Sequence, residues 1–304
     1  GFVAGGYKSV GTLAAQIEEV RSSTSTFGVN LFAPNPLPVS PDQYRAYARA
    51  INEDAQQYGL DLTSVAPRED DDEWADKIEL LITDPVPVVS FTFGVPRRVV
   101  VDTLRRAGST VVQTVTSAAE AAAAASAGID VLVVQCHEAG GHSATLTPRS
   151  PSPAVPLAEL VRAVRAGGAA LVIAAGGIGT PGSVQEVLSA GADAVMVGTV
   201  LLRTDESGAS PTYRAALADR RDAPTVVTRA FTGRPARGLR NTFTDRFSDQ
   251  APSGYPALHH LTSPLRKAAV AAGDPELVNL WAGTGYKSAT AEPAAAILTR
   301  LAAG

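Results

Sequence analysis

The sequence predicts an α/β fold in which parallel strands close into a (β/α)8 TIM barrel, followed by an appended, mainly helical C-terminal region. Three observations lead to this prediction. Short apolar, β-branched runs alternate with alanine- and leucine-rich helical stretches up to about residue 200. The runs are apolar almost throughout, as expected of strands buried on both faces. Glycine or polar residues follow several runs, at the strand ends where such barrels carry their functional groups.

Seven apolar runs along the chain are expected to form strands. They cover residues 2–4, 27–32, 86–93, 110–115, 130–135, 170–175 and 192–197. The helical stretches between them cover residues 12–21, 41–58, 73–82, 97–107, 117–127, 157–166 and 180–190. A chain that alternates in this way is typical of a parallel sheet with helical crossovers.

The seven predicted strands are one fewer than the eight that a closed barrel of this type needs. Residues 1–7 have the character of a short buried strand and a turn rather than of a free N-terminus. We therefore expect the first strand to lie upstream of residue 1. An open doubly wound sheet is the competing architecture.

The pattern changes after Thr199, where regular alternation gives way to a stretch rich in Gly, Pro and Arg. We predict that residues 1–204 form the barrel, that residues 205–262 form an appended helical and loop region over its mouth, and that residues 263–304 form helices that pack back on the barrel. Helices are expected around residues 213–220, 264–272 and 292–301.

Composition excludes several classes of protein. The chain has 304 residues, 45% of them hydrophobic and 18% charged, with a formal net charge of -4, so we expect neither a nucleic-acid nor a membrane-surface partner. We find no apolar run near the roughly 20 residues that span a bilayer, and no signal peptide. The single cysteine, Cys136, cannot form an internal disulfide, which favours a cytoplasmic location.

Glycines end two consecutive strands near residue 200. Gly176 and Gly177 follow one strand, and Gly198 and Thr199 follow the next. Glycine lets backbone N–H groups approach a phosphate, and the loops after the last two strands are where many barrels hold one. We therefore predict a phosphate site here, with tight turns as the simpler alternative.

The loop that begins at Gln135 carries the sharpest chemical signal. It is long for a connection between a strand and a helix, and Gly140-Gly141 leaves room for a flat ligand before His142. An imidazole with a pKa near neutrality suits removal of a proton from a weak carbon acid, although a lone loop histidine more often bonds a carbonyl. His137 and Glu138 lack a third matching cluster, so we predict no metal site, and we interpret Cys136 as a packed thiol.

Three other features are polar or aromatic in an unexpected place. Asn30 interrupts an apolar strand. The pair His259-His260 does not share a helix or strand face, so we interpret it as a surface or interdomain feature. Residues 281–286 place glycines between Trp281 and Tyr286, which suggests either a loop that closes on a ring or phosphate, or a helix stop with aromatic packing.

Taken together, these segments resemble the nitronate monooxygenase family, also called 2-nitropropane dioxygenase-like proteins. The matching segments are residues 4–7, 28–32, 90–94, 135–142, 175–178, 198–199 and 281–285, in family order. The most specific is Glu-Ala-Gly-Gly-His at residues 138–142. The family's first strand, with its Ala-Pro-Met segment, has no counterpart here.

The resemblance implies FMN as the cofactor and a role for each matching residue. Asn30, Gln135 and Gly140 would contact the flavin, and His142 would be the catalytic base. Gly177 and the run Met196, Val197, Gly198 and Thr199 would hold the ribityl chain and phosphate. The family oxidises alkyl nitronates with O2 to carbonyl compounds and nitrite, and His142 would deprotonate a neutral nitroalkane. A homodimer is left open.

Two other functions compete with this one. An FMN-dependent enoyl-ACP reductase shares the Gly-Gly-His loop and would use NAD(P)H. A flavin-binding protein without turnover is the second alternative. The appended region that would shape the pocket has no readable motif, so chain-length preference is not predicted.

Overall fold

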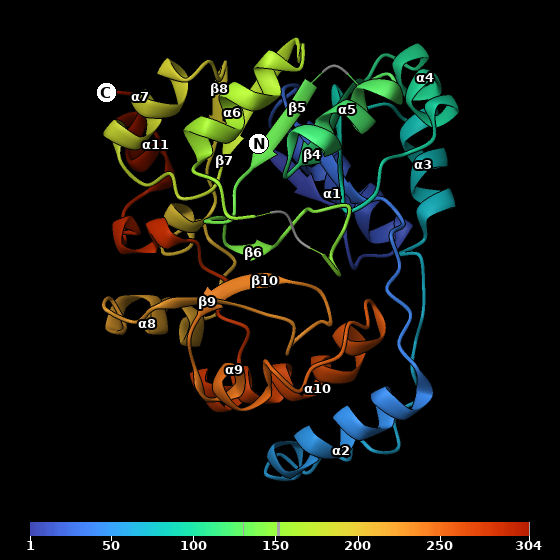
Figure 1. Ribbon diagram of the computed structural model, residues 1–304, viewed down its shortest axis with the longest axis vertical. Helices are drawn as coiled ribbons and strands as arrows, with labels where there is room; N and C mark the ends of the chain where they lie inside the picture. Colours follow the sequence, from blue (N-terminus) through green and yellow to red (C-terminus); the bar gives the residue numbers. More distant parts are fainter. Residues whose placement is uncertain (130, 151–152, 304) are drawn as a thin grey trace.

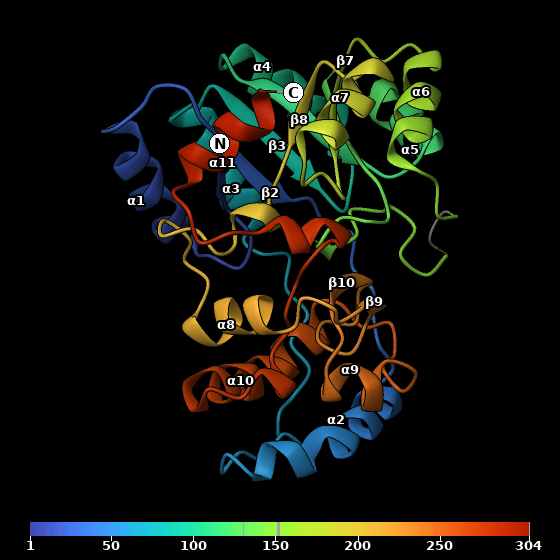
Figure 2. The ribbon, with the colours of Figure 1, turned by 90° about the vertical axis from the view of Figure 1, so that its left-hand side faces the viewer.

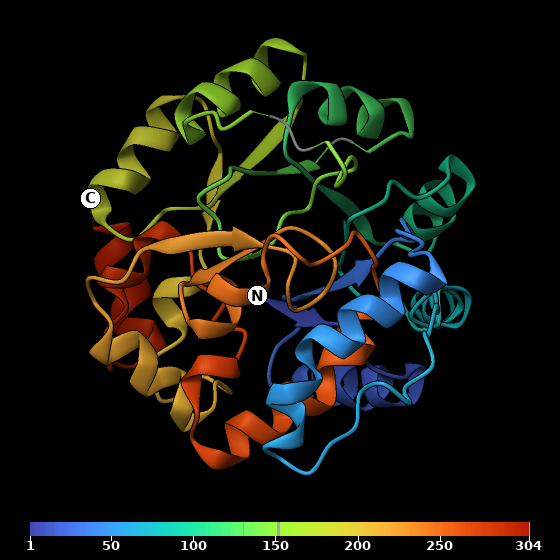
Figure 3. The ribbon, with the colours of Figure 1, turned by 60° about the horizontal axis from the view of Figure 1, so that its bottom comes forward.

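The computed structural model describes residues 1–129, 131–150 and 153–303. Within these residues, seven parallel strands form one curled sheet in the order β1-β2-β3-β4-β5-β7-β8, with helices around its outside (Figures 1 and 3). The strands are β1 (Phe2–Ala4), β2 (Gly28–Phe32), β3 (Val88–Thr92), β4 (Thr110–Val115), β5 (Val131–Gln135), β7 (Leu171–Ala175) and β8 (Ala194–Met196). The predicted TIM-barrel-like α/β fold is confirmed. Residue 130, the predicted start of the fifth strand, lies outside the described residues.

Six barrel helices follow the predicted alternation. They are α1 (Val10–Arg21), α3 (Trp74–Thr83), α4 (Arg98–Arg106), α5 (Ala118–Ser126), α6 (Leu157–Ala166) and α7 (Pro181–Ser189). The helix α11 (Ala294–Ala302), expected as a C-terminal helix, packs beside α7. Val29 and Leu31 of β2 are buried in the same apolar cluster as the helix residues. Asn30 lies between them on a strand whose side chains alternate in direction, and it therefore points into the barrel.

A smaller lobe packs below the barrel in Figure 1. It contains α2 (Pro41–Gln56), α8 (Pro211–Asp219), α9 (Thr242–Phe247), α10 (Ala257–Ala272) and the 3-10 helix η2 (Pro275–Leu277), and their buried side chains form a second apolar cluster. The helix α2 leaves the barrel after β2 and packs against α10, far from the sheet (Figure 2). The domain bounds 1–204, 205–262 and 263–304 stay a prediction. The helix α2 nevertheless packs with the lobe, because its apolar face is buried there.

A three-stranded antiparallel sheet joins the two parts, and it was not predicted. It consists of β6 (Gly141–His142), β10 (Ala236–Leu239) and β9 (Thr225–Thr228), with His142 opposite Ala236. A strand of two residues inside a long loop has no period of its own, so only its distant partner defines it. The two remaining 3-10 helices of the described residues are η1 (Thr199–Leu201) and η3 (Thr284–Ser288).

The helix expected at residues 264–272 begins earlier, at Ala257, and contains Pro264 in its interior. Proline lacks the N–H that continues a helix, which is why the sequence favoured a start there. The Nη2 atom of Arg266 donates to the carbonyl oxygen of His259 at 3.0 Å, in the helical turn before the proline. None of the helices in the described ranges is both long and apolar enough to cross a membrane.

Candidate active site

The loops after β5, β7 and β8 meet the loop before η3 around a cavity of about 190 Å³, which we call the glycine cavity. Of the eight residues predicted to bind the cofactor, seven line it and Asn30 does not. The lining residues are Gln135, Ala139, Gly140, Ala175, Gly176, Gly177, Ile178, Met196, Val197, Gly198, Thr199, Gly283 and Gly285. The cavity therefore unites the two predicted phosphate loops with residues 283–285.

Backbone, rather than side chains, forms most of this cavity. A Cβ added to Gly140 would overlap the backbone nitrogen of Gly283 and lie 2.7 Å from the carbonyl carbon of Ala282. Gly177 has φ +71° and faces the carboxylate of Glu138 in the same tight manner. The backbone contact at Gly140 and the positive φ at Gly177 therefore disfavour a larger residue at both positions.

Hydrogen bonds fasten residues 281–286 to the strand-end loops. The backbone nitrogen of Gly283 donates to the Oγ1 atom of Thr199 at 3.1 Å, and that of Thr284 donates to the carbonyl oxygen of Glu138 at 3.0 Å. Of the two interpretations of this segment, the structure favours a loop that closes over the cavity.

The start of α7 adds a favourable field for an anion. Thr180 caps this helix, and Gly176–Gly177 lead into it from β7. A helix N-terminus carries partial positive charge, although here Pro181 has no N–H and the N–H of Ser183 is bonded to Thr180. The charge of the helix start therefore favours an anion beside the glycine cavity.

Asn30 lies inside the barrel with one end of its amide already occupied. Its Oδ1 atom accepts hydrogen bonds from the hydroxyls of Ser90 and Thr92, both at 3.0 Å. Because only the oxygen can accept, these bonds orient the amide and leave its Nδ2 donors directed elsewhere. Asn30 can therefore offer N–H groups to a ligand at the barrel mouth.

Gln135 ties the loop that carries His142 to the barrel. Its Oε1 atom accepts from the backbone nitrogen of Ala144 at 2.8 Å, and its Nε2 atom donates to the carbonyl oxygen of His142 at 3.3 Å. Gln135 also lines the glycine cavity. One side chain at the end of β5 therefore links the position of His142 to the cavity wall.

His142 is half-buried among aromatic rings and cations. Its ring centroid lies 5.6 Å from that of Phe93, 6.0 Å from that of Tyr255 and 5.7 Å from that of Trp281. Burial, followed by the positive charges of Arg234 and Arg266, lowers the pKa of His142 to about 3. The imidazole is therefore neutral at physiological pH, with one nitrogen able to accept a proton.

Comparison with known proteins agrees with this geometry. The chain matches the nitronate monooxygenase family over residues 1–303. The chain belongs to this family. A probable nitronate monooxygenase of Staphylococcus aureus (strain Newman) is 34% identical over 312 residues, covering 99% of this chain and 86% of the relative. The family consists of flavin-dependent oxidoreductases, so the chain is an enzyme of this type.

Two solved structures extend the comparison. Nitroalkane oxidase from Streptomyces ansochromogenes superposes with a TM-score of 0.93 at 43% identity, covering 100% of this chain and 87% of the other. FabK from Thermotoga maritima superposes with a TM-score of 0.74 at 25% identity, covering 100% and 83%. The likeness to both extends over barrel and lobe.

Arg234 is a buried cation whose charge acts on His142. It is 0% exposed, and its guanidinium lies 4.0 Å from the centroid of Phe93. Its Nη2 atom donates to the carbonyl oxygen of Thr145 at 2.6 Å. Its other hydrogen-bond partner is the carbonyl oxygen of Asn35, and no carboxylate of the described residues forms an ion pair with it, so its positive charge favours an anion nearby.

The same loop carries two other reactive side chains, those of Cys136 and His137. Cys136 is buried, and burial raises the pKa of its thiol to about 11, so it stays protonated. The Nδ1 atom of His137 lies 3.3 Å from the carbonyl oxygen of Val155. Across the described ranges, no three His, Cys, Asp or Glu residues gather as a metal site would require.

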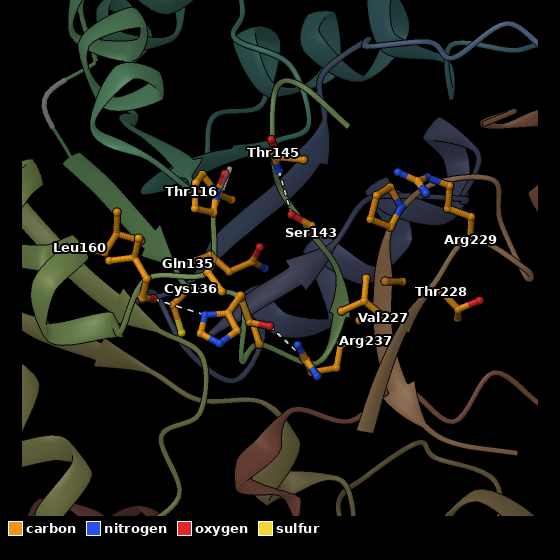
Figure 4. A pocket seen from close by; sticks show the side chains of 18 of the residues that line it. Thr116, Gln135, Cys136, Ser143, Thr145, Leu160, Val227, Thr228, Arg229 and Arg237 are labelled. Atoms are coloured by element: carbon orange, nitrogen blue, oxygen red, sulfur yellow. Dashed lines mark hydrogen bonds between the residues drawn. The ribbon is translucent and has the colours of Figure 1, made fainter. Parts of the chain in front are cut away.

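A second cavity of about 420 Å³ lies on the opposite face of β6, and we call it the arginine crevice (Figure 4). Gly141 and Ser143 line it, whereas His142 between them points the other way, as alternation along a strand requires. Arg229 and Arg237 approach it from the lobe (Figure 4). The crevice shares Gln135 and Ala139 with the glycine cavity.

Sequence reasoning missed three residues that surround His142: Thr232, Arg234 and Tyr255. They come from the lobe, in a stretch without periodicity. The only available signal was the short cluster Arg234, Arg237 and Arg240, which has no meaning until β10 pairs with β6. Phe93 and Trp281 lay within recognised segments, but nothing in those segments indicated contact with His142.

Proposed function

We propose that this enzyme uses FMN to oxidise alkyl nitronates with O2, giving a carbonyl compound and nitrite. The observation that carries the proposal is the union, on one loop, of a backbone-lined anion cavity at Gly140 and a neutral imidazole at His142. The similarity to a nitroalkane oxidase supports substrates that carry a nitro group. We also infer that the enzyme acts in the cytoplasm, and a homodimer stays open.

FMN fits the residues present because glycine-rich loops after β7 and β8 line the cavity, at the strand ends where barrels of this type hold a phosphate. Gly177 and Met196, Val197, Gly198 and Thr199 would hold the ribityl chain and phosphate, with Gly283 and Gly285 completing the wall. Asn30 would donate through Nδ2, and Gln135 and Gly140 would border the ring. When bound, FMN accepts electrons from the substrate and passes them to O2.

His142 would act on a neutral nitroalkane by accepting a proton from the carbon that bears the nitro group. Its low pKa keeps it unprotonated, but it also makes the imidazole a weak base. The buried guanidinium of Arg234 would stabilise the nitronate anion that results. A preformed nitronate needs no such proton transfer, so we propose nitronates as the better substrates.

The first test is direct. The purified protein should show the absorption spectrum of a flavin, release FMN on denaturation, and consume O2 with propyl nitronate while producing nitrite. A flavin-free protein that neither binds added FMN nor consumes O2 with propyl nitronate would contradict the proposal.

The role of His142 is tested by its substitution. We expect His142→Ala to retain flavin and to lose activity with neutral nitroalkanes by about 100-fold or more, with a much smaller loss on preformed nitronates. His137→Ala is the matched control in the same loop and should affect both substrates little. Equal losses of His142→Ala on the two substrates would eliminate its role as the base.

Two measurements separate the alternatives. Rapid anaerobic bleaching of the flavin by NADH, without O2 uptake on nitronates, would indicate the enoyl-ACP reductase. Retained FMN with no turnover on either substrate, and no effect of His142→Ala, would indicate a binding protein.

A further inference from the structure

The hydroxyl of Thr232 connects His142 to the backbone of the lobe. Its Oγ1 atom lies 2.9 Å from the Nε2 atom of His142, 3.2 Å from the carbonyl oxygen of Arg234 and 3.4 Å from the backbone nitrogen of Arg234. Thr232 is 1% exposed and Arg234 is 0% exposed, so water cannot replace a missing partner. The hydrogen atoms available on Thr232, His142 and the backbone of Arg234 therefore decide which of these groups donates to which.

A hydroxyl has one hydrogen to donate and two lone pairs to accept with. If Thr232 donates to the carbonyl oxygen of Arg234, its own oxygen accepts from the backbone N–H of Arg234 and from an Nε2–H of His142. Every member of the group then has a partner.

The opposite arrangement leaves a group unpaired. If Thr232 donates to the Nε2 atom of His142, the carbonyl oxygen of Arg234 loses the one donor that the described residues offer it. A buried carbonyl without a donor is costly, because it loses its hydrogen bond to water on folding and gains none. The first arrangement is therefore the more stable.

We propose that Thr232 is a positioning residue that holds His142 in the Nε2–H tautomer, so that Nδ1 is the atom that accepts the proton. The assignment of the proton acceptor rests on the proposed function, whereas the tautomer does not.

The surroundings of the ring agree with an open Nδ1 atom. It accepts no hydrogen bond from the described residues, and it is not among the fully buried nitrogen atoms left without a partner, so it is not completely enclosed. Phe93, Tyr255 and Trp281 contact the ring through their aromatic faces and edges. The charged groups that act on it most are the cations Arg234 and Arg266, which oppose a second proton.

The decisive experiment is nitrogen NMR of the holoenzyme labelled with 15N-histidine. The chain has four histidines, so a His142→Gln variant identifies the His142 signals. We expect a protonated, pyrrole-type Nε2 and an unprotonated, pyridine-type Nδ1 at neutral pH. A protonated Nδ1 in the wild type would overturn the proposal, whether or not the enzyme acts on nitro compounds.

Two variants test the hydroxyl itself. Thr232→Ser keeps it and should preserve the tautomer signals, whereas Thr232→Val removes it and should give signals averaged between the two tautomers. A Thr232→Val spectrum identical to the wild type would show that the hydroxyl does not set the tautomer. If Thr232→Val does not fold, the wild-type and Thr232→Ser spectra still decide.

Activity then tests the role of Nδ1 separately. With a neutral nitroalkane, Thr232→Val should lower kcat about fivefold, as expected for the loss of one hydrogen bond, with KM nearly unchanged and Thr232→Ser near the wild type. A Thr232→Val enzyme with wild-type kcat would refute the assignment of Nδ1 as acceptor. If the wild type consumes no O2 with any nitro compound, it is the proposed function that fails, and the NMR result stands.

Discussion

The candidate site has two parts, the glycine cavity and the surroundings of His142, which Gln135 links and which are built in opposite ways. Backbone groups of loops after parallel strands form the first wall, and a Cβ at Gly140 would overlap the backbone of Gly283 across it. Side chains form the second: Phe93 comes from the barrel, and Thr232, Arg234 and Tyr255 come from the lobe. The first wall suits a phosphate-bearing cofactor that is the same for every substrate. Side chains of the second wall can be substituted, and so adapted to a different substrate, without altering the first wall.

The largest effect should come from filling the backbone wall. Gly140→Ala places a methyl group against Gly283, and such overpacking typically costs about 1–3 kcal/mol, so we expect FMN affinity to fall about 10- to 100-fold. FMN titration followed by flavin fluorescence measures this. Gly11→Ala, whose added methyl group meets no atom within 4 Å, is the control and should bind FMN normally. Unchanged affinity in Gly140→Ala would mean that the glycine cavity is not the FMN site.

Changing the side-chain wall should leave FMN binding intact and alter His142 instead. Arg234→Gln removes a positive charge, so the pKa of His142 should rise, while the lost donation to Thr145 should cost about 1–3 kcal/mol of unfolding free energy. NMR titration of His142 reports the first effect and urea unfolding the second.

The charge and the shape of Arg234 can be separated by a conservative variant. Arg234→Lys keeps the charge but not the fork of donors, so the pKa of His142 should stay low while stability still falls. A pKa that rises equally in both variants would show that packing, and not charge, lowers it.

The contrast between the walls also explains what the sequence could predict. Gly177, Gly198 and the 138–142 segment are recognisable because glycines at the end of an apolar strand stand out locally, and the order of strands brings them together. Thr232 and Tyr255 belong to no local pattern, and their contacts with His142 depend on the pairing of β6 with β10. The start of α10 at Ala257 could not be predicted for a related reason, because a proline inside a helix, here Pro264, depends on contacts with residues distant in the sequence.

The neutral state of His142 predicts how stability depends on pH. Its pKa is about 3 in the folded protein and near 6.5 when unfolded, so between these values the unfolded chain binds the extra proton. The unfolding free energy should therefore fall as pH drops from 6.5 toward 3, by up to about 2 kcal/mol at pH 5 for this group. Burial lowers the pKa of His259 to about 2 and acts in the same direction.

Urea unfolding at pH 7.5 and pH 5 tests this dependence. His142→Gln should lose less stability than the wild type between the two pH values, because the His259 contribution remains. An identical loss in both proteins would indicate that His142 titrates normally and is not held neutral by its surroundings.

The smallest effect is expected from the hydroxyl of Tyr255, and it shows which part of the side-chain wall matters. Tyr255 donates to the hydroxyl of Tyr7 at 3.0 Å, while its ring packs edge-on against Phe93 and His142. Tyr255→Phe keeps the ring, so we expect a loss of about 1 kcal/mol in unfolding free energy and a KM for propyl nitronate near the wild-type value. Tyr255→Leu removes the aromatic edge and should raise KM more. If the two variants raised KM equally, the hydroxyl of Tyr255 rather than its ring would determine substrate binding. The side-chain wall at His142 would then act through a polar group and not through the aromatic contacts seen in the structure.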